Sequence, residues 1–383
     1  MNGWKKTTLG EMAEINPSES LKAGTVAKYV AMENLTPFTR EVSRYEMKEF
    51  KSGSKFRNGD TLLARITPCL ENGKTAFVDF LEEHEIAFGS TEFIVIREKE
   101  NISDKKFLYY FVTSPNFRES AIKSMSGTSG RQRVQTDLIA DKYFFFPPLP
   151  EQKAIAAVLS SFDDKIELLR RQNKTLEQIA QTVFKEWFVK FRIQNTEVRI
   201  NKKTALPEGW RIGKLGDILE LAYGKALKEE ERTGKGYPVI GSSGIVGYHS
   251  EYLANSFGIV VGRKGSMGTV IWIEDNFFPI DTTFYVVDRL GVKDLYFHYF
   301  VLKNIDFQKI GSDSAVPGLN RTLACSLELV VPQKEAVEEY NKTVEPIFYK
   351  IKNNNSQIQT LSKLRDTLLP KLMKGEIRIK SDK

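Results

Sequence analysis

Apolar residues recur at alternating spacings of four and three along two long stretches of the chain. The first stretch runs from about Glu151 to Phe188, and the second, from about Ala336 to Met373, repeats its stripe 185 residues later. Heptad spacing over more than four heptads is typical of a coiled coil. Each stretch therefore predicts one long helix, about 55 Å long for the first at 1.5 Å per residue.

The two stripes place candidate core residues at matching positions of the two helices. These residues are Ile166, Leu169, Asn173, Leu176, Ile351, Asn354, Ile358 and Leu361. Antiparallel pairing with pseudo-two-fold symmetry puts the partner of residue i at 527 − i, so that Asn173 faces Asn354, Ile166 faces Leu361 and Leu176 faces Ile351. A facing pair of asparagines can hydrogen-bond and fix the register. The alternative is two amphipathic helices, each packed only on its own globular domain.

Three prolines mark the predicted helices. Pro150, followed by Glu151, is a suitable first-turn residue for the first helix. Pro346 lies inside the second stretch and predicts either a kink or a late helix start there, and Pro370 should perturb the last turns.

The remainder of each half lacks helical periodicity and carries short apolar, β-branched or aromatic runs between Gly, Asn and Pro. Such runs predict strands, and they are 60–66, 92–96, 257–261, 269–273 and 283–287. Short helices are expected near 105–114 and 292–303. The predicted fold class is α+β, with two strand-rich domains at 1–148 and 193–330 and long helices at 149–192 and 331–377.

The sequence also contains an internal repeat outside the two helical stretches. Gly3-Trp4-Lys5-Lys6-Thr7-Thr8-Leu9-Gly10-Glu11 is echoed by Gly209-Trp210-Arg211-Ile212-Gly213-Lys214-Leu215-Gly216-Asp217, and 134–138 is echoed by 319–323. Two copies predict a pseudo-two-fold internal repeat rather than a solenoid. The shift is 206 residues at the tryptophan and 185 at the helix, so the first domain carries about 21 extra residues.

Composition indicates the kind of partner and the cellular compartment. The 383 residues carry a formal net charge of +7, which favours a polyanionic partner, with a generic basic surface as the alternative. The two cysteines, Cys69 and Cys325, cannot form a disulfide framework or a zinc site. No run of 18 apolar residues and no signal-peptide pattern occur, so we expect a cytoplasmic protein without a membrane partner.

Catalytic and cofactor motifs are missing from the sequence. Asn72-Gly73-Lys74-Thr75 resembles the end of a P-loop, but Pro68 occupies the position of its first glycine. The three histidines are scattered and have no ligand-spaced neighbours. No Asn-Pro-Pro-aromatic motif is present. We therefore expect no catalytic residues, no metal site and no bound cofactor.

Polar, basic loops occupy corresponding places in the two halves. Candidate DNA contacts are Ser126, Thr128, Arg131, Gln132 and Arg133 in the first, and Ser312, Asn320 and Arg321 in the second. Arg, Gln and Asn can read guanine and adenine edges, and Ser and Thr suit phosphate oxygens. The glycine-rich segment 262–268 adds Arg263 and Lys264 as phosphate contacts. Solvated connections, and a plain hairpin turn for 262–268, are the alternatives.

Several of these stretches resemble one known family. They are Pro147-Pro148-Leu149-Pro150-Glu151-Gln152-Lys153, Phe184-Lys185-Glu186-Trp187-Phe188-Val189, Leu206-Pro207-Glu208-Gly209-Trp210 and Leu368-Leu369-Pro370-Lys371-Leu372-Met373-Lys374-Gly375-Glu376-Ile377. Their order is similar to that in the specificity subunits of type I restriction-modification systems, over essentially the whole chain. The start of the second helix, Pro332-Gln333-Lys334-Glu335-Ala336, departs from the family pattern.

The resemblance implies a division of labour. Each domain would read one half of a split, asymmetric DNA target, and the antiparallel helix pair would act as a ruler between the half-sites. Two methyltransferase subunits, which carry S-adenosylmethionine, would dock on this non-catalytic chain, and motor-nuclease restriction subunits would join for cleavage. The competing classes are a self-contained enzyme and a protein-binding coiled-coil scaffold without DNA recognition.

Overall fold

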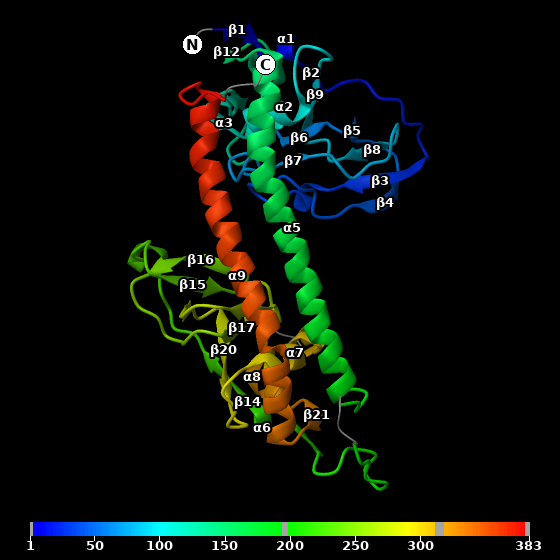
Figure 1. Cartoon of the computed structure of the whole chain (residues 1–383), viewed down its shortest axis with the longest axis vertical. Helices are drawn as coiled ribbons and strands as arrows, with labels where there is room; N and C mark the ends of the chain where they lie inside the picture. The colour runs from blue at the N-terminus through cyan, green and yellow to red at the C-terminus, as the bar shows by residue number, and fades with distance from the viewer. Residues whose placement is uncertain (1–2, 194–197, 311–317, 380–383) are drawn as a thin grey trace. The chain divides into compact units, whose positions relative to one another are not determined.

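The computed structural model describes residues 3–193, 198–310 and 318–379. The chain divides into two compact units, one formed by Met1–Arg170 with Ser356–Lys383 and the other by Arg171–Asn355. Each unit holds one globular domain together with a segment of each long helix (Figure 1). The first unit is mixed α and β, and so is the second, which agrees with the predicted fold class.

The two predicted long helices are both present, each with 40 residues. They are α5, Leu149–Phe188, and α9, Lys334–Met373. Pro150 lies in the first turn of α5, where a missing backbone N–H costs nothing. The late start considered for the second helix is wrong, because α9 begins twelve residues before Pro346 and continues past Pro370. Packing of its apolar stripe outweighs the loss of one hydrogen bond at each proline.

The first domain contains two four-stranded sheets, ordered β2-β9-β6-β7 and β4-β3-β8-β5, and two-stranded pairs β1-β12 and β10-β11. Its strands are β1 (Lys5–Thr8), β2 (Ala13–Ile15), β3 (Val26–Val30), β4 (Glu46–Glu49), β5 (Ser54–Arg57), β6 (Thr61–Ala64), β7 (Thr75–Phe77), β8 (Ile86–Gly89), β9 (Phe93–Glu98), β10 (Met125–Ser126), β11 (Arg133–Val134) and β12 (Tyr143–Phe146). Its helices are α1 (Leu9–Met12), η1 (Met32–Asn34), α2 (Lys105–Thr113), α3 (Pro115–Lys123) and α4 (Thr136–Ala140).

The second domain contains the sheets β14-β20-β17-β18 and β16-β15-β19 and the pair β13-β21. Its strands are β13 (Arg211–Lys214), β14 (Leu219–Tyr223), β15 (Tyr237–Gly241), β16 (Gly244–His249), β17 (Gly258–Gly262), β18 (Val270–Ile273), β19 (Phe278–Pro279), β20 (Thr283–Asp288) and β21 (Glu328–Val331). Its helices are α6 (Leu215–Ile218), η2 (Glu229–Glu231), α7 (Tyr296–Lys303), η3 (Phe307–Ile310) and α8 (Arg321–Cys325).

The strand order confirms the internal repeat inferred from sequence. In both domains the first sheet places its strands in the same chain order, and β2 pairs with β9 as β14 pairs with β20. The second sheet of each domain contains one parallel pair, β3 with β8 and β15 with β19. Strand β5 and helix α3 have no counterpart among the described elements of the second domain, and they account for part of the longer first domain.

The core of the first unit joins its domain to both helices. Ile155 and Leu159, near the start of α5, share one buried cluster with Leu372, near the end of α9, and with Phe107 and Phe111 of α2. Because the start of one helix meets the end of the other, the two segments run antiparallel within this unit. Further along, buried Asp163 of α5 accepts a hydrogen bond from Arg365 of α9, which explains the arginine in the apolar stripe.

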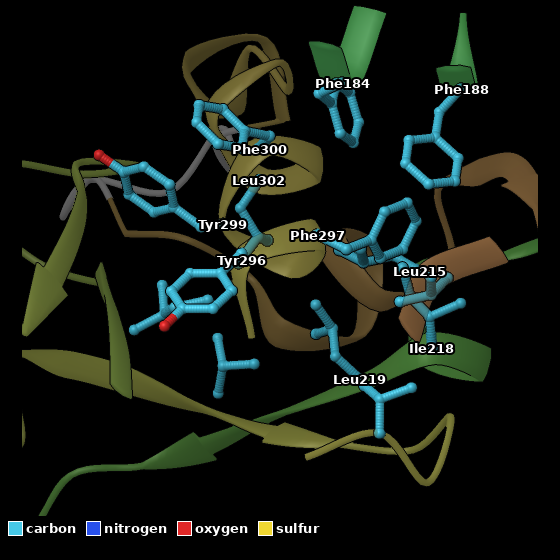
Figure 2. Packing of buried hydrophobic residues seen from close by; sticks show 14 of the residues in the cluster. Phe184, Phe188, Leu215, Ile218, Leu219, Tyr296, Phe297, Tyr299, Phe300 and Leu302 are labelled. Atoms are coloured by element: carbon cyan, nitrogen blue, oxygen red, sulfur yellow. The ribbon is translucent and has the colours of Figure 1, made fainter. Parts of the chain in front are cut away.

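In the second unit the other ends of the helices meet in an aromatic core. Phe184 and Phe188 of α5 converge on Phe297 and Phe300 of α7, as Figure 2 shows. Tyr340 of α9 is fully buried, stacks edge-on against Phe184 and Phe188, and donates a hydrogen bond to the Ala180 carbonyl at 3.1 Å. The helix segments are therefore antiparallel in this unit too.

The predicted asparagine pair is confirmed within the second unit. Asn354 Nδ2 donates to Asn173 Oδ1 at 2.8 Å, and Asn173 Nδ2 donates to Asn355 Oδ1 at 2.8 Å. Asn355 in turn donates to Glu274 Oε1 at 2.8 Å, which extends the chain of amides into the globular domain. This contact has the register predicted for antiparallel pairing, and Asn355 ties the helices to the loop after β18.

The remaining candidate core residues are distributed as follows. Ile166, Leu169 and Asn354 are buried, whereas Asn173, Leu176, Ile351, Ile358 and Leu361 are partly buried. The facing of Ile166 with Leu361 and of Leu176 with Ile351 stays a prediction.

Candidate nucleic-acid interface

In both domains an arginine directly follows the buried strand that lies third in the order of the first sheet. Arg65 follows β6 and Arg263 follows β17. The amide of Arg65 donates to Glu92 O and its carbonyl accepts from Val134 N, at 2.9 and 2.8 Å. Arg263 makes the equivalent two bonds, with Thr282 O and Leu319 N, each at 2.9 Å. The backbone of each arginine is therefore held in the same way between two segments.

Sequence reasoning found Arg263 but missed Arg65. The available signal was an arginine at the end of an apolar run in both copies, 59–65 and 257–263. Only the strand register shows that the two residues correspond, because Ala64 pairs with Phe93 where Gly262 pairs with Thr283.

The predicted loop of the first domain includes Ser126 of β10, Arg133 of β11 and the connection between these strands. Ser126, Thr128 and Arg131 are exposed, and Gln132 is partly buried. The backbone of Gln132 is fixed by Thr67, whose Oγ1 accepts from Gln132 N at 3.0 Å. The Ser126 hydroxyl accepts a hydrogen bond from Gln135. No hydrogen bond to the side chains of Thr128, Arg131 or Gln132 is found within the described residues, which leaves these polar groups available to a ligand.

Arg133 is differently placed from its neighbours in this loop. Its guanidinium contacts the carboxylate of Glu92 through Nη2 at 2.6 Å and Nε at 3.0 Å. This hydrogen bonding with Glu92 raises the pKa of Arg133. A DNA contact by Arg133 must either use its remaining N–H groups or displace Glu92, so Arg131 is the less encumbered cation of the two.

The corresponding residues of the second domain lie around the start of α8. Asn320 caps this helix, since its Oδ1 accepts from Leu323 N at 3.1 Å. A bidentate contact with adenine uses both the oxygen and the nitrogen of an asparagine amide. The cap therefore uses one of the two lone pairs of the Asn320 oxygen and restricts the orientation of the amide while α8 is intact. Ser312 lies outside the described residues.

Arg321 and Arg263 gather around one exposed ring. The guanidinium of Arg263 lies 5.0 Å and that of Arg321 5.4 Å from the centre of the Tyr223 ring. Arg321 also pairs with Glu220 at 2.8 Å, and Glu220 pairs with Arg289 at 2.9 Å. Arg263 donates to the Asp281 carbonyl at 3.2 Å. These contacts restrict the planes of both guanidinium groups.

Segment 262–268 is the hairpin connection between β17 and β18. Gly262 N donates to Thr269 O at 2.8 Å, and Gly268 N donates to Gly262 O at 2.8 Å, which closes the turn. Gly265 and Gly268 both have positive φ, as such a tight connection requires. Lys264 is exposed on this turn. The backbone is thus that of a hairpin, and the turn presents Arg263 and Lys264.

Two further findings concern metals and membranes. Over residues 3–193, 198–310 and 318–379, no group of three or more His, Cys, Asp or Glu side chains could hold a metal ion. Among the helices in the described parts of the chain, none is long and apolar enough to span a membrane.

Comparison with known proteins identifies the family. The model of the type I restriction modification DNA specificity domain matches residues 1–178 and 207–363. The chain therefore belongs to the type I restriction-modification DNA specificity family.

Relatives and a solved structure agree with this assignment. The MjaIX specificity subunit of Methanocaldococcus jannaschii is 30% identical, over 72% of this chain and 69% of that protein. The HindI specificity subunit of Haemophilus influenzae is 24% identical, over 98% of this chain and all of that protein. The S subunit of a type I system from M. genitalium has a similar fold, with a TM-score of 0.57, 20% identity and 96% of each chain covered.

Proposed function

We propose that this chain is the DNA-recognition subunit of a type I restriction-modification complex, in which each globular domain reads one half of a split, asymmetric target. The observation that carries the proposal is one repeated scaffold with different side chains at equivalent positions. Arg65 and Arg263 occupy equivalent positions. Arg133 forms a β-bridge with Ile66, the residue after Arg65, and Gly318 forms one with Lys264, the residue after Arg263. Arg133 therefore corresponds to Gly318, which has no side chain to contact a base. Two surfaces on one scaffold suit two unlike half-sites.

Family membership and the missing catalytic motifs support the rest of the division of labour. In this proposal the chain is not an enzyme and binds no cofactor itself. Two methyltransferase subunits, carrying S-adenosylmethionine, dock on it and methylate adenine, and motor-nuclease subunits join where the system cleaves. The 40-residue helices, each about 60 Å long at 1.5 Å per residue, set the spacing between half-sites.

The test uses the complex of this chain with its methyltransferase subunits. Methylated sites in a random-sequence DNA library should define one bipartite motif, and the chain alone with labelled S-adenosylmethionine should give background counts. Turnover by the chain alone would favour a self-contained enzyme. A complex without salt-dependent DNA affinity would favour a protein-binding scaffold.

Side-chain substitutions test the first loop within the same complex. Arg131→Ala combined with Arg133→Ala should weaken binding, by about 1–3 kcal/mol if a guanine contact is lost. Loss of a phosphate contact should instead lower the salt slope by about one. Unchanged binding and unchanged salt dependence would show that the loop is only a connection. Lys123→Ala, which removes an exposed lysine of the neighbouring α3, is the matched control.

A further inference from the structure

Tyr223 is an unusual residue at the end of the edge strand β14. Half of its surface is exposed, yet its ring packs edge-on against the buried Phe284 at 5.0 Å. The guanidinium groups of Arg263 and Arg321 lie close to the same ring, and Arg263 also lies 5.8 Å from the Phe284 ring. One anchored tyrosine thus gathers two cations at a surface.

The charges of this cluster do not balance. Glu220 accepts from both Arg289 and Arg321, and these two arginines hold the pKa of the Glu220 carboxyl below its usual range. Arg263 makes no ion pair with any described carboxylate. Three arginines with one glutamate therefore leave an excess of positive charge beside an exposed ring, which is the electrostatic character of a site for an anion.

The shared scaffold does not require this cluster. Strand register places Pro17 of the first domain at the position of Tyr223 and Ile94 at that of Phe284. Thr136 occupies the position equivalent to Arg321. Each is the first residue of the short helix that follows the β-bridge made by Arg133 or Gly318. The same register gives Arg263, Glu220 and Arg289 counterparts in the first domain, at Arg65, Glu14 and Lys99, whereas Tyr223 and Arg321 have no similar residue there. A role confined to the second domain therefore explains the cluster better than a role in folding.

We propose that Tyr223 is a positioning residue of the second domain's DNA contact, holding Arg263 against a phosphate and Arg321 against a base edge. This inference rests on the function proposed above. Tyr223 itself acts through the two arginines, and Glu220 orients Arg321 from the other side.

The different partners of the two arginines assign their roles. The charge of Arg321 is already matched by Glu220, so Arg321 gains little from a phosphate but keeps directed N–H groups for guanine O6 and N7. Among the described residues, the Arg263 guanidinium has only a carbonyl as its polar partner, and its charge is available to a phosphate. Stacking on a ring fixes each guanidinium plane in advance, which reduces the entropy lost on binding.

The experiment measures binding of the complete methyltransferase complex to its methylated motif and to single-base variants at several salt concentrations. Tyr223→Phe keeps the ring and should bind within about twofold of the wild type. Tyr223→Leu removes it and should weaken binding to the motif by roughly tenfold, which corresponds to about 1.4 kcal/mol. Tyr248→Leu, at an exposed tyrosine of β16 over which no described cation lies, is the matched control and should bind like wild type.

The arginine variants separate the two roles. Arg263→Ala should weaken binding to all duplexes alike and lower the salt slope by about one. Arg321→Ala should weaken binding to the motif and relax preference at one base pair. Combined with Tyr223→Leu, each should cost less than the sum of the single changes, because the ring acts through the arginines.

Three outcomes would overturn the inference. Wild-type binding by Tyr223→Leu, equal losses in Tyr223→Leu and Tyr223→Phe, or additive losses in both double variants would each do so while leaving bipartite recognition intact. A wild-type complex without sequence-specific binding would overturn the function proposed above and this inference together. Thermal unfolding midpoints of each variant show whether a loss reflects misfolding.

Discussion

The two globular domains share a topology but are joined to their helix segments by different chemistry. In the first unit charged contacts supplement the apolar core between the domain and the helices. Arg40 contacts Asp164 and Glu167 at 2.6 Å each, and the buried Asp163 is held between Tyr110 and Arg365. In the second unit the junction is made of rings, with Phe184, Phe188 and Tyr340 packed on α7.

The difference has energetic consequences. Aromatic side chains contribute mainly through the apolar area that they bury, and the geometry of each ring pair adds a smaller amount. Buried ion pairs contribute little net stability, because desolvation offsets attraction, but they are costly to break from one side and demand one geometry. The stability of each domain's junction with its helix segments should therefore respond to a different kind of substitution, and substitutions can test each junction independently.

The largest expected effect is in the aromatic junction. Phe297→Ala removes a ring that is 1% exposed and contacts both Phe184 and Phe188. We expect it to destabilise the second unit by about 4 kcal/mol, through lost transfer energy and a residual cavity. Hydrogen exchange, read separately over the two units, measures this loss. Comparable deprotection of the first unit would contradict independent junctions.

Breaking the charged junction from one side should cost somewhat less. Asp163→Asn removes the buried carboxylate that pairs with the partly buried Arg365, which then keeps its contact with the exposed Asp366. The amide oxygen can still accept from Tyr110. A loss of about 3 kcal/mol is expected in the first unit. Asp163→Leu combined with Arg365→Met should restore most of it, whereas Asp366→Asn, at an exposed carboxylate next to Arg365, should change little. A double variant as unstable as the single one would disprove the ion-pair account.

Substitution of the asparagine pair tests whether these residues fix the register of the two helix segments. Replacing Asn173 and Asn354 together by leucine should raise the stability of the second unit by about 1 kcal/mol, because polar groups leave the seam. The same change should broaden the NMR signals of the helix segments as other registers become accessible. Changing Asn354 alone leaves Asn173 Oδ1 without its donor and should destabilise. Sharp signals in the double variant would show that the pair does not fix register.

The smallest effect is a pH dependence confined to the second unit. Burial raises the pKa of Glu274, with Asp275 adding to the shift and Asn355 and Lys352 opposing it. A raised folded-state pKa means that the folded form binds more protons, so this contribution is full below the unfolded pKa of about 4.3. It is then lost as pH rises through the raised value. Glu274→Gln should make the thermal unfolding midpoint less dependent on pH over that window. A pH profile of the midpoint identical to that of the wild type would contradict the assignment.

Periodicity and repetition made much of the fold predictable. Heptad spacing located both helices, and the symmetry of the two stripes predicted that Asn173 faces Asn354, as the hydrogen bond between them confirms. Apolar, β-branched and aromatic runs located β6, β9, β17, β18 and β20, because such strands need only local sequence to be recognised.

Side-chain partnerships of the site were less predictable, because they join residues far apart in the chain. Glu92 meets Arg133 across 41 residues, and Tyr223 meets Arg321 across nearly a hundred. The register of β6 with β9 decides where Arg65 lies, and the capping bond that engages Asn320 depends on where α8 begins. No composition or spacing rule supplies these contacts.

The most direct test of the account is a methylation motif determined for three forms of the complex. Wild type should define two specific half-sites. Arg131→Ala with Gln132→Ala should alter base preference in one half-site only, and Arg321→Ala should alter it in the other half-site only. A single variant that changes both halves, or wild-type methylation without a bipartite motif, would contradict the claim that two repeated domains read two different DNA sequences.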